Sequence, residues 1–67
     1  MYYIVNKNKD SKGYNEVHIT TCAYRPDEQN QYPLGWHDNA KQAVTYAKSI
    51  GYSADGCYYC CPDAHHG

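Results

Sequence analysis

The spacing of apolar and polar positions predicts two strands at the start of the chain. Residues 2–6 (YYIVN) are dense in residues with high strand propensity. Residues 14–20 (YNEVHIT) alternate, with Val17 and Ile19 on one face and the more polar side chains on the other. The polar stretch between them, residues 7–13, ends in glycine and is typical of a turn. The pattern therefore predicts a β-hairpin.

The same pattern predicts one helix in the second half of the chain. Apolar residues recur there at helical spacing and form one stripe: Ala40, Ala43, Val44, Ala47 and Ile50. Asp38 or Asn39 can cap its start, and Asn39 with Gln42 resembles a capping box. Gly51 lies where a left-handed residue would end the helix. The stripe is rich in alanine, so the helix can approach a sheet closely but buries little area.

The remaining segments predict the rest of the fold. Residues 32–36 (YPLGW) could form a short third strand, which Pro33 confines to a sheet edge or a strand start. Residues 52–56 are expected to be a short extended return, and the tail 62–67 is expected to be loose unless a histidine there binds metal. At 67 residues the chain is one domain. We expect an α+β fold with an antiparallel sheet of two or three strands and one helix across it.

The composition predicts a core that is too small to be stable without a crosslink. The chain has one leucine, three isoleucines and three valines, and it has no phenylalanine. Nine tyrosines and Trp36 supply the remaining apolar area, and each tyrosine hydroxyl needs a partner or water, so many should be half-buried. Chains of this length often depend on a disulfide or a metal.

Charge and hydropathy limit the classes of partner and the compartment. The formal net charge is −1, whereas nucleic-acid binders of this size usually present a basic face. The first ten residues lack the basic and apolar regions of a signal peptide, and no apolar stretch could span a membrane. We therefore expect a cytoplasmic protein, in which clustered cysteines indicate metal or redox sites more than disulfides.

Four residues have the spacing of a single zinc site. His18 and Cys22 are separated by three residues, and Cys57 and Cys60 by two, so that two close pairs lie about 35 residues apart. Two such pairs of imidazole and thiolate ligands can enclose one tetrahedral Zn²⁺ ion. The sequence thus predicts a structural zinc site with a C-terminal zinc knuckle at Cys57 and Cys60.

Other interpretations of these residues stay open at the level of sequence. The cysteines could be buried thiols or disulfide partners. The adjacent thiols of Cys60 and Cys61 could be redox-active. The fourth zinc ligand could be Cys61, His65 or His66 in place of His18, because Cys61 and His65 are also separated by three residues.

The order of these features resembles the zinc-binding domain at the N-terminus of the Ada DNA-repair protein and its small stand-alone relatives. In that family a ligand–x3–Cys element is followed by an aromatic strand, an alanine-rich helix, Gly-Tyr and Cys-x2-Cys-containing segments. The matching segments here are VHITTC (17–22), LGW (34–36), AKQAVTYA (40–47), GY (51–52) and CYYCCP (57–62). The chain is also similar to small bacterial proteins that end in a GCxYC-type segment and a histidine tail.

The resemblance implies a ligand set and excludes part of the family's chemistry. Cys22, Cys57 and Cys60 would be zinc thiolates, and His18 would take the remaining place. At the place that His18 takes in this chain, Ada has a cysteine that accepts a methyl group from DNA. A neutral imidazole is no comparable acceptor. The family's basic residues near the last cysteines are also replaced by Tyr58 and Tyr59. The resemblance therefore implies the fold and the site more than DNA repair.

These observations favour a non-catalytic protein-interaction module over an enzyme. A shell of three thiolates and one imidazole leaves no open position for catalysis, and no paired carboxylates, nucleophile elbow or phosphate loop is visible. Exposed tyrosines favour protein contact, and the best candidates for partner contact are Tyr24, Arg25, Tyr58 and Tyr59. The alternatives are a nucleic-acid-binding zinc module of the Ada type and a small inhibitor that docks on a larger target.

Overall fold

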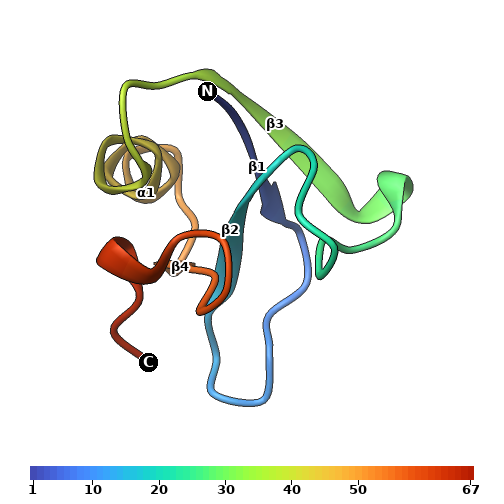
Figure 1. Ribbon diagram of the computed structural model, residues 1–67. Helices are drawn as coiled ribbons and strands as arrows, with labels where there is room; N and C mark the ends of the chain where they lie inside the picture. Colours follow the sequence, from blue (N-terminus) through green and yellow to red (C-terminus); the bar gives the residue numbers. More distant parts are fainter.

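The computed structural model describes all 67 residues of the chain. One helix, four strands and two 3₁₀ turns follow one another along the sequence (Figure 1). In chain order they are β1 (Tyr2–Asn6), β2 (Asn15–Ile19), η1 (Glu28–Asn30), β3 (Gln31–Trp36), α1 (Ala40–Ser49), β4 (Ala54–Gly56) and η2 (Pro62–Ala64).

The strands form one mixed sheet in the order β3-β1-β2-β4. Strand β1 pairs antiparallel with both β2 and β3, and the β1–β2 hairpin has Val5 opposite Val17 and Ile4 opposite His18. The predicted α+β class with one helix is confirmed. The sheet is larger than the expected two or three antiparallel strands, because the short return at Ala54–Gly56 pairs in parallel with β2.

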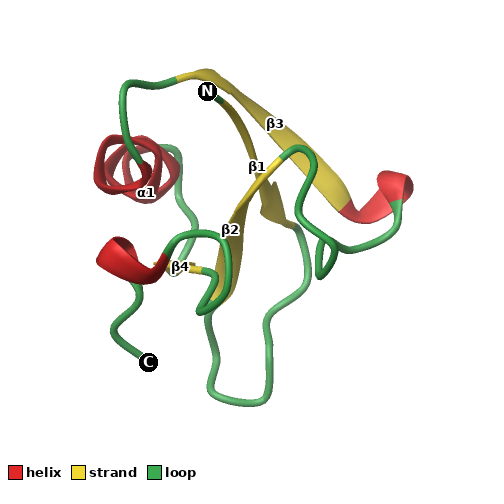
Figure 2. Cartoon of the chain, in the orientation of Figure 1, coloured by secondary structure: helices red, strands yellow, loops and turns green.

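The main core lies between the sheet and the layer formed by α1 and η2, which cover the same side of the sheet (Figures 1 and 2). Its buried residues are Tyr3, Val5, Val17, Leu34, Ala43, Val44, Ala47, Ala54, Cys61 and Ala64. Neighbouring residues of a strand point to opposite faces. Because Val17 faces this core, His18 projects from the other face of the sheet, where its cross-strand neighbour Ile4 is also buried.

The helix begins and ends as its sequence predicts. The Asn39 side chain accepts a hydrogen bond from the backbone N–H of Gln42 at 2.9 Å, and the Gln42 side chain accepts one from the N–H of Asp38. Gly51, with φ of +107°, occupies the left-handed position after the helix. The predicted apolar stripe is wrong at Ile50, which follows the last helical residue, Ser49, and is 40% exposed.

The C-terminal tail is held in place, contrary to the expectation of a loose end. The buried Asp55 carboxylate accepts hydrogen bonds from the backbone N–H groups of His66 and Gly67, each at 2.9 Å. Ala64 of η2 packs in the core directly against Gly56. The tail is therefore fixed by β4 and by its own apolar contact, and a metal-bound histidine is not what holds it.

The tyrosines contribute less to the core than their number suggests. Tyr3 is buried and Tyr52 is half-buried. The other seven are exposed: Tyr2, Tyr14, Tyr24, Tyr32, Tyr46, Tyr58 and Tyr59.

The only α-helix, α1, is too short and too polar to cross a membrane.

Candidate metal centre

The pairing of β2 with β4 brings the two predicted ligand pairs together. His18 lies near the end of β2, and Cys22 lies in the tight turn that follows, where its N–H donates to the carbonyl of Ile19 at 3.0 Å. Cys57 comes directly after β4, and its N–H donates to the carbonyl of Val17 at 2.9 Å. The parallel hydrogen-bonding pattern between β2 and β4 therefore continues to Cys57, which places Cys57 and Cys60 beside His18.

The four predicted ligand residues converge on one point. One ligand atom from each of His18, Cys22, Cys57 and Cys60 lies within 4.8 Å of all the others. The Sγ atoms of Cys22 and Cys57 are 4.0 Å apart, and the Sγ of Cys60 is 3.9 Å from Nδ1 of His18. Zinc–sulfur bonds of about 2.3 Å place two sulfurs of a tetrahedron about 3.8 Å apart. The cluster could therefore hold one metal ion with little rearrangement.

The electrostatics of the cluster fit a cation in its centre. Burial raises the pKa of the Cys60 thiol, and the neighbouring thiols of Cys22 and Cys61 raise it further. Burial lowers the pKa of His18, which keeps its ring neutral and able to act as a ligand. Several buried thiolates are stable only beside a compensating positive charge. Thiolate and imidazole together are the donors preferred by zinc and related borderline metals.

Two further contacts orient the ligand atoms. Oε1 of Glu16 lies 3.5 Å from Nε2 of His18, so the carboxylate faces the ring nitrogen that points away from the cysteines. The backbone N–H of Tyr24 donates to Sγ of Cys22 at 3.4 Å. Burial raises the pKa of Glu16, with a smaller contribution from Asp10. Such outer contacts commonly fix the orientation of a metal-binding histidine and stabilise thiolates.

The other residues considered as ligands lie outside the cluster. His65 is part of the tail contact, with its Nδ1 at 2.9 Å from the carbonyl oxygen of Gly56. His66 is exposed. Cys61 is close, with its Sγ 3.6 Å from that of Cys60, but it is not one of the four converging residues. All four cysteines are free thiols, so the alternative of a disulfide framework is not what the structure contains.

The residues predicted to contact a partner lie on the two loops that carry the cysteines. Tyr24 follows Cys22, and its ring stacks on that of Tyr59 with centroids 4.1 Å apart and planes 16° apart. Tyr58 packs edge-on against Tyr59, with centroids 5.1 Å apart. These three residues, here called the tyrosine cluster, are 61%, 62% and 63% exposed. Arg25 lies beside them, and its Nη1 donates to the carbonyl of Cys22 at 2.8 Å.

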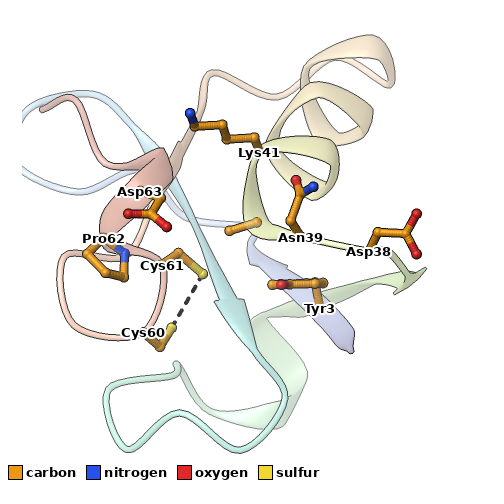
Figure 3. A pocket seen from close by; sticks show the side chains of 9 residues that line it. Tyr3, Asp38, Asn39, Lys41, Cys60, Cys61, Pro62 and Asp63 are labelled. Carbon is orange, nitrogen blue, oxygen red and sulfur yellow. Dashed lines mark hydrogen bonds between the residues drawn. The ribbon is translucent and has the colours of Figure 1, made fainter.

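A cavity next to the four candidate ligands was not predicted from the sequence. It has a volume of about 460 Å³ and lies between the start of α1 and the segment that follows Cys60 (Figure 3). Cys60 and Cys61 line one side of it, and Tyr3 lies across from them (Figure 3). In the sequence, only the pair of adjacent cysteines pointed to this cavity. The wall opposite them comes from the start of α1, around Asp38–Lys41, and the sequence alone does not show that these two segments meet.

The fold and the cluster define a small α+β domain with a Cys3His group that could hold a metal ion. Comparisons with protein-family models, with curated proteins and with solved structures find no match to this chain.

Proposed function

We propose that the chain is a structural zinc domain that acts as a non-catalytic protein-interaction module. Zn²⁺ is the metal proposed because three thiolates and one imidazole form a common shell for structural zinc. The spacing of the sulfur and nitrogen atoms supports this choice, since it is close to that of a tetrahedron around zinc. When bound, the ion would connect the end of the hairpin to the C-terminal segment.

A structural role follows from the number of protein ligands. Catalytic zinc sites keep one position for water or substrate, whereas four protein donors fill a tetrahedral shell. Cys22, Cys57 and His18 are all buried, which also keeps substrate away from the ion. We therefore propose a site that holds two loops in place, with no chemical step at the metal.

The observation that carries the interaction role is the tyrosine cluster. Tyr24, Tyr58 and Tyr59 are highly exposed, yet they pack on one another, so their rings are already ordered before a partner binds. Ordered aromatic side chains with a polar end are typical of the energetic centre of protein interfaces. The ligands Cys22, Cys57 and Cys60 anchor both loops, so metal binding would determine whether the cluster forms.

Nucleic-acid binding of the Ada type is the second candidate. It is supported by the resemblance of the sequence and by Tyr24, whose ring could stack on a base beside the Arg25 guanidinium. The net charge of −1 favours a protein partner instead, whether this is a regulatory complex or a target that the chain inhibits. A cytoplasmic location is part of the proposal, because a reducing compartment keeps four thiols available for metal.

Partner capture with variants of the tyrosine cluster tests this proposal. Immobilised zinc-loaded protein should retain a defined protein from the source cells after nuclease treatment, and the double variant Tyr24→Ser/Tyr59→Ser should lose it. Tyr46→Ser is the matched control, because Tyr46 is also exposed but lies on α1. Binding that disappears with nuclease or falls steeply with salt would indicate the nucleic-acid alternative. Equal capture by the double variant and the control would contradict the proposal.

A further inference from the structure

Cys61 is a thiol that the metal centre does not use. Its side chain is buried, and its Sγ lies 3.6 Å from the Sγ of Cys60 (Figure 3). The backbone around it is fixed, because its N–H donates to the carbonyl of Cys57 at 2.9 Å and its own carbonyl accepts from the N–H of Ala64 at 3.0 Å. A candidate metal ligand and a spare thiol are therefore held next to each other.

Solvent reaches Cys60 more readily than it reaches the other three cysteines. Cys60 and Cys61 both line the cavity of about 460 Å³, and Cys60 is partly exposed. Cys61 is only 1% exposed and lies behind Cys60, whereas Cys22 and Cys57, 5% and 2% exposed, do not line the cavity at all. A small molecule that reacts with thiolates would therefore meet Cys60 first.

We infer that Cys60 and Cys61 form a site of reversible thiol oxidation, with a small hydroperoxide as the oxidant. The inference deepens the proposed function, since Cys60 is there a zinc ligand. Oxidation at this site would remove Cys60 from the metal centre and leave His18, Cys22 and Cys57 as the only ligands. The same pair would thus couple the redox state of the cell to the integrity of both loops.

The chemistry balances with hydrogen peroxide as the oxidant. The Cys60 thiolate attacks one peroxide oxygen, an S–O bond forms, the O–O bond breaks, and the leaving hydroxide takes a proton from solvent. Cys61 sulfur then attacks Cys60 sulfur, an S–S bond replaces the S–O bond, and the second hydroxide leaves as water with the Cys61 proton. Two sulfurs lose two electrons in total, and the peroxide is reduced to two waters.

The position of the two cysteines predicts that the product is easily reduced. Adjacent residues have Cα atoms about 3.8 Å apart, which is closer than the separation of about 4.4 Å or more found in ordinary disulfides. A disulfide between neighbours is therefore strained, and strained disulfides are the labile ones that cellular thiols can reverse. This property suits a switch better than a permanent crosslink.

Peptide mapping after peroxide treatment tests the inference directly. Cleavage after Tyr58 and Tyr59 separates Cys57 from Cys60 but leaves Cys60 and Cys61 on one peptide. We expect that peptide to be lighter by two hydrogen atoms, with zinc released in parallel and recovered on reduction. A crosslink between the Cys57 and Cys60 peptides, or four unmodified thiols, would overturn the inference.

The variant Cys61→Ala provides a second test of the inference. In this variant the disulfide within one peptide cannot form, so oxidised Cys60 should instead carry added oxygen or become crosslinked to Cys22 or Cys57, whose sulfurs lie within 4.8 Å of it, and zinc recovery after reduction should be slower or less complete than in wild type. Pro62→Ala is the control, since it alters the exposed neighbour but no sulfur. Zinc release and recovery in Cys61→Ala at the same rate and to the same extent as in wild type would show that Cys61 is not the resolving thiol and would overturn the inference. Absence of zinc from the untreated protein would contradict the proposed function instead, and the peptide map would still decide the oxidation site.

Discussion

At the scale of single residues, the candidate centre depends on how each donor is held. His18 is buried with Nδ1 toward the cysteines and Nε2 toward Glu16, so contacts on both sides set the orientation of its ring. The turn after β2 fixes Cys22, and a backbone N–H reaches its sulfur. Gly56 permits the close approach of the C-terminal segment, because a Cβ there would lie 2.7 Å from the carbonyl oxygen of Cys61.

Replacement of the histidine tests the composition of the shell. His18→Ala should weaken zinc binding more than about 100-fold, since loss of an outer contact alone costs up to that factor. His65→Ala/His66→Ala should bind zinc like wild type, because both rings lie outside the cluster. Competition with a chromogenic chelator measures both affinities. Equal losses in the two variants, or a larger loss in the tail variant, would contradict the assignment.

Gly56→Ala tests the tight packing of the C-terminal segment on β4. The added methyl group would meet backbone atoms of Cys61 and Ala64, which cannot move independently of η2. We expect a loss of about 1–3 kcal/mol in the free energy of unfolding, the usual cost of overpacking. Urea unfolding of the zinc-loaded protein measures this loss. Ser53→Ala, an exposed change in the same segment, should stay within about 0.5 kcal/mol of wild type. Equal stability of the two variants would contradict the packing argument.

At the scale of elements, the parallel pairing of β4 with β2 is the feature that makes the site. Strand β4 has only three residues, Ala54–Gly56, yet its register places Cys57 beside Val17 and thus beside His18. Helix α1 stands between β3 and β4 in the chain and covers the sheet with Ala43, Val44 and Ala47. After the helix, the chain therefore rejoins the sheet at β4, directly before the second ligand pair, Cys57 and Cys60.

The N-terminal cap of α1 stabilises the fold independently of the candidate metal centre. Asn39 satisfies the free N–H of Gln42, and loss of such a cap costs about 1 kcal/mol. Asn39→Ala should therefore lower the unfolding free energy by that amount, while Asn39→Ser should retain most of it. Zinc affinity measured with folded protein should stay unchanged, since the cap does not touch the cluster. A cost for serine as large as for alanine would show that the side-chain cap is not what stabilises α1.

At the scale of the whole molecule, the interior is small, and the proposed metal centre would compensate for it. One leucine, small helix residues and a single buried tyrosine make up much of the core. The candidate centre lies outside that core and joins residues separated by about 35 positions. A metal bound there would link the hairpin to the C-terminus, which the sheet connects only through the short β4 strand.

The sequence predicted the parts of this architecture that depend on local patterns. The hairpin, the edge strand with Pro33 and the helix with its Asn39 cap follow from periodicity and capping, and all are present. The fourth strand could not be predicted, because Ala54–Gly56 has no strand propensity and pairs only through its distant neighbour β2. The ordered tail could not be predicted for a similar reason. The Asp55 carboxylate holds it by hydrogen bonds to backbone N–H groups, and these bonds do not depend on which residues carry the groups.

Removal of the metal tests the stabilising role. Treatment of the zinc-loaded protein with a strong chelator should abolish the cooperative thermal transition, because binding energy of structural zinc is largely folding energy in domains of this size. Circular dichroism at increasing temperature measures the transition, and addition of zinc should restore it. A melting curve that is the same with and without chelator would show that the core is sufficient by itself.

The most direct test of the central claim is the metal content of the native protein, measured together with its thiols. Elemental analysis of protein purified under reducing conditions should give about one zinc per chain. Thiol titration after unfolding with chelator should then recover all four cysteines. Protein that contains no metal, or that lacks two of its thiols because they form a disulfide, would contradict the claim that His18, Cys22, Cys57 and Cys60 enclose one cation.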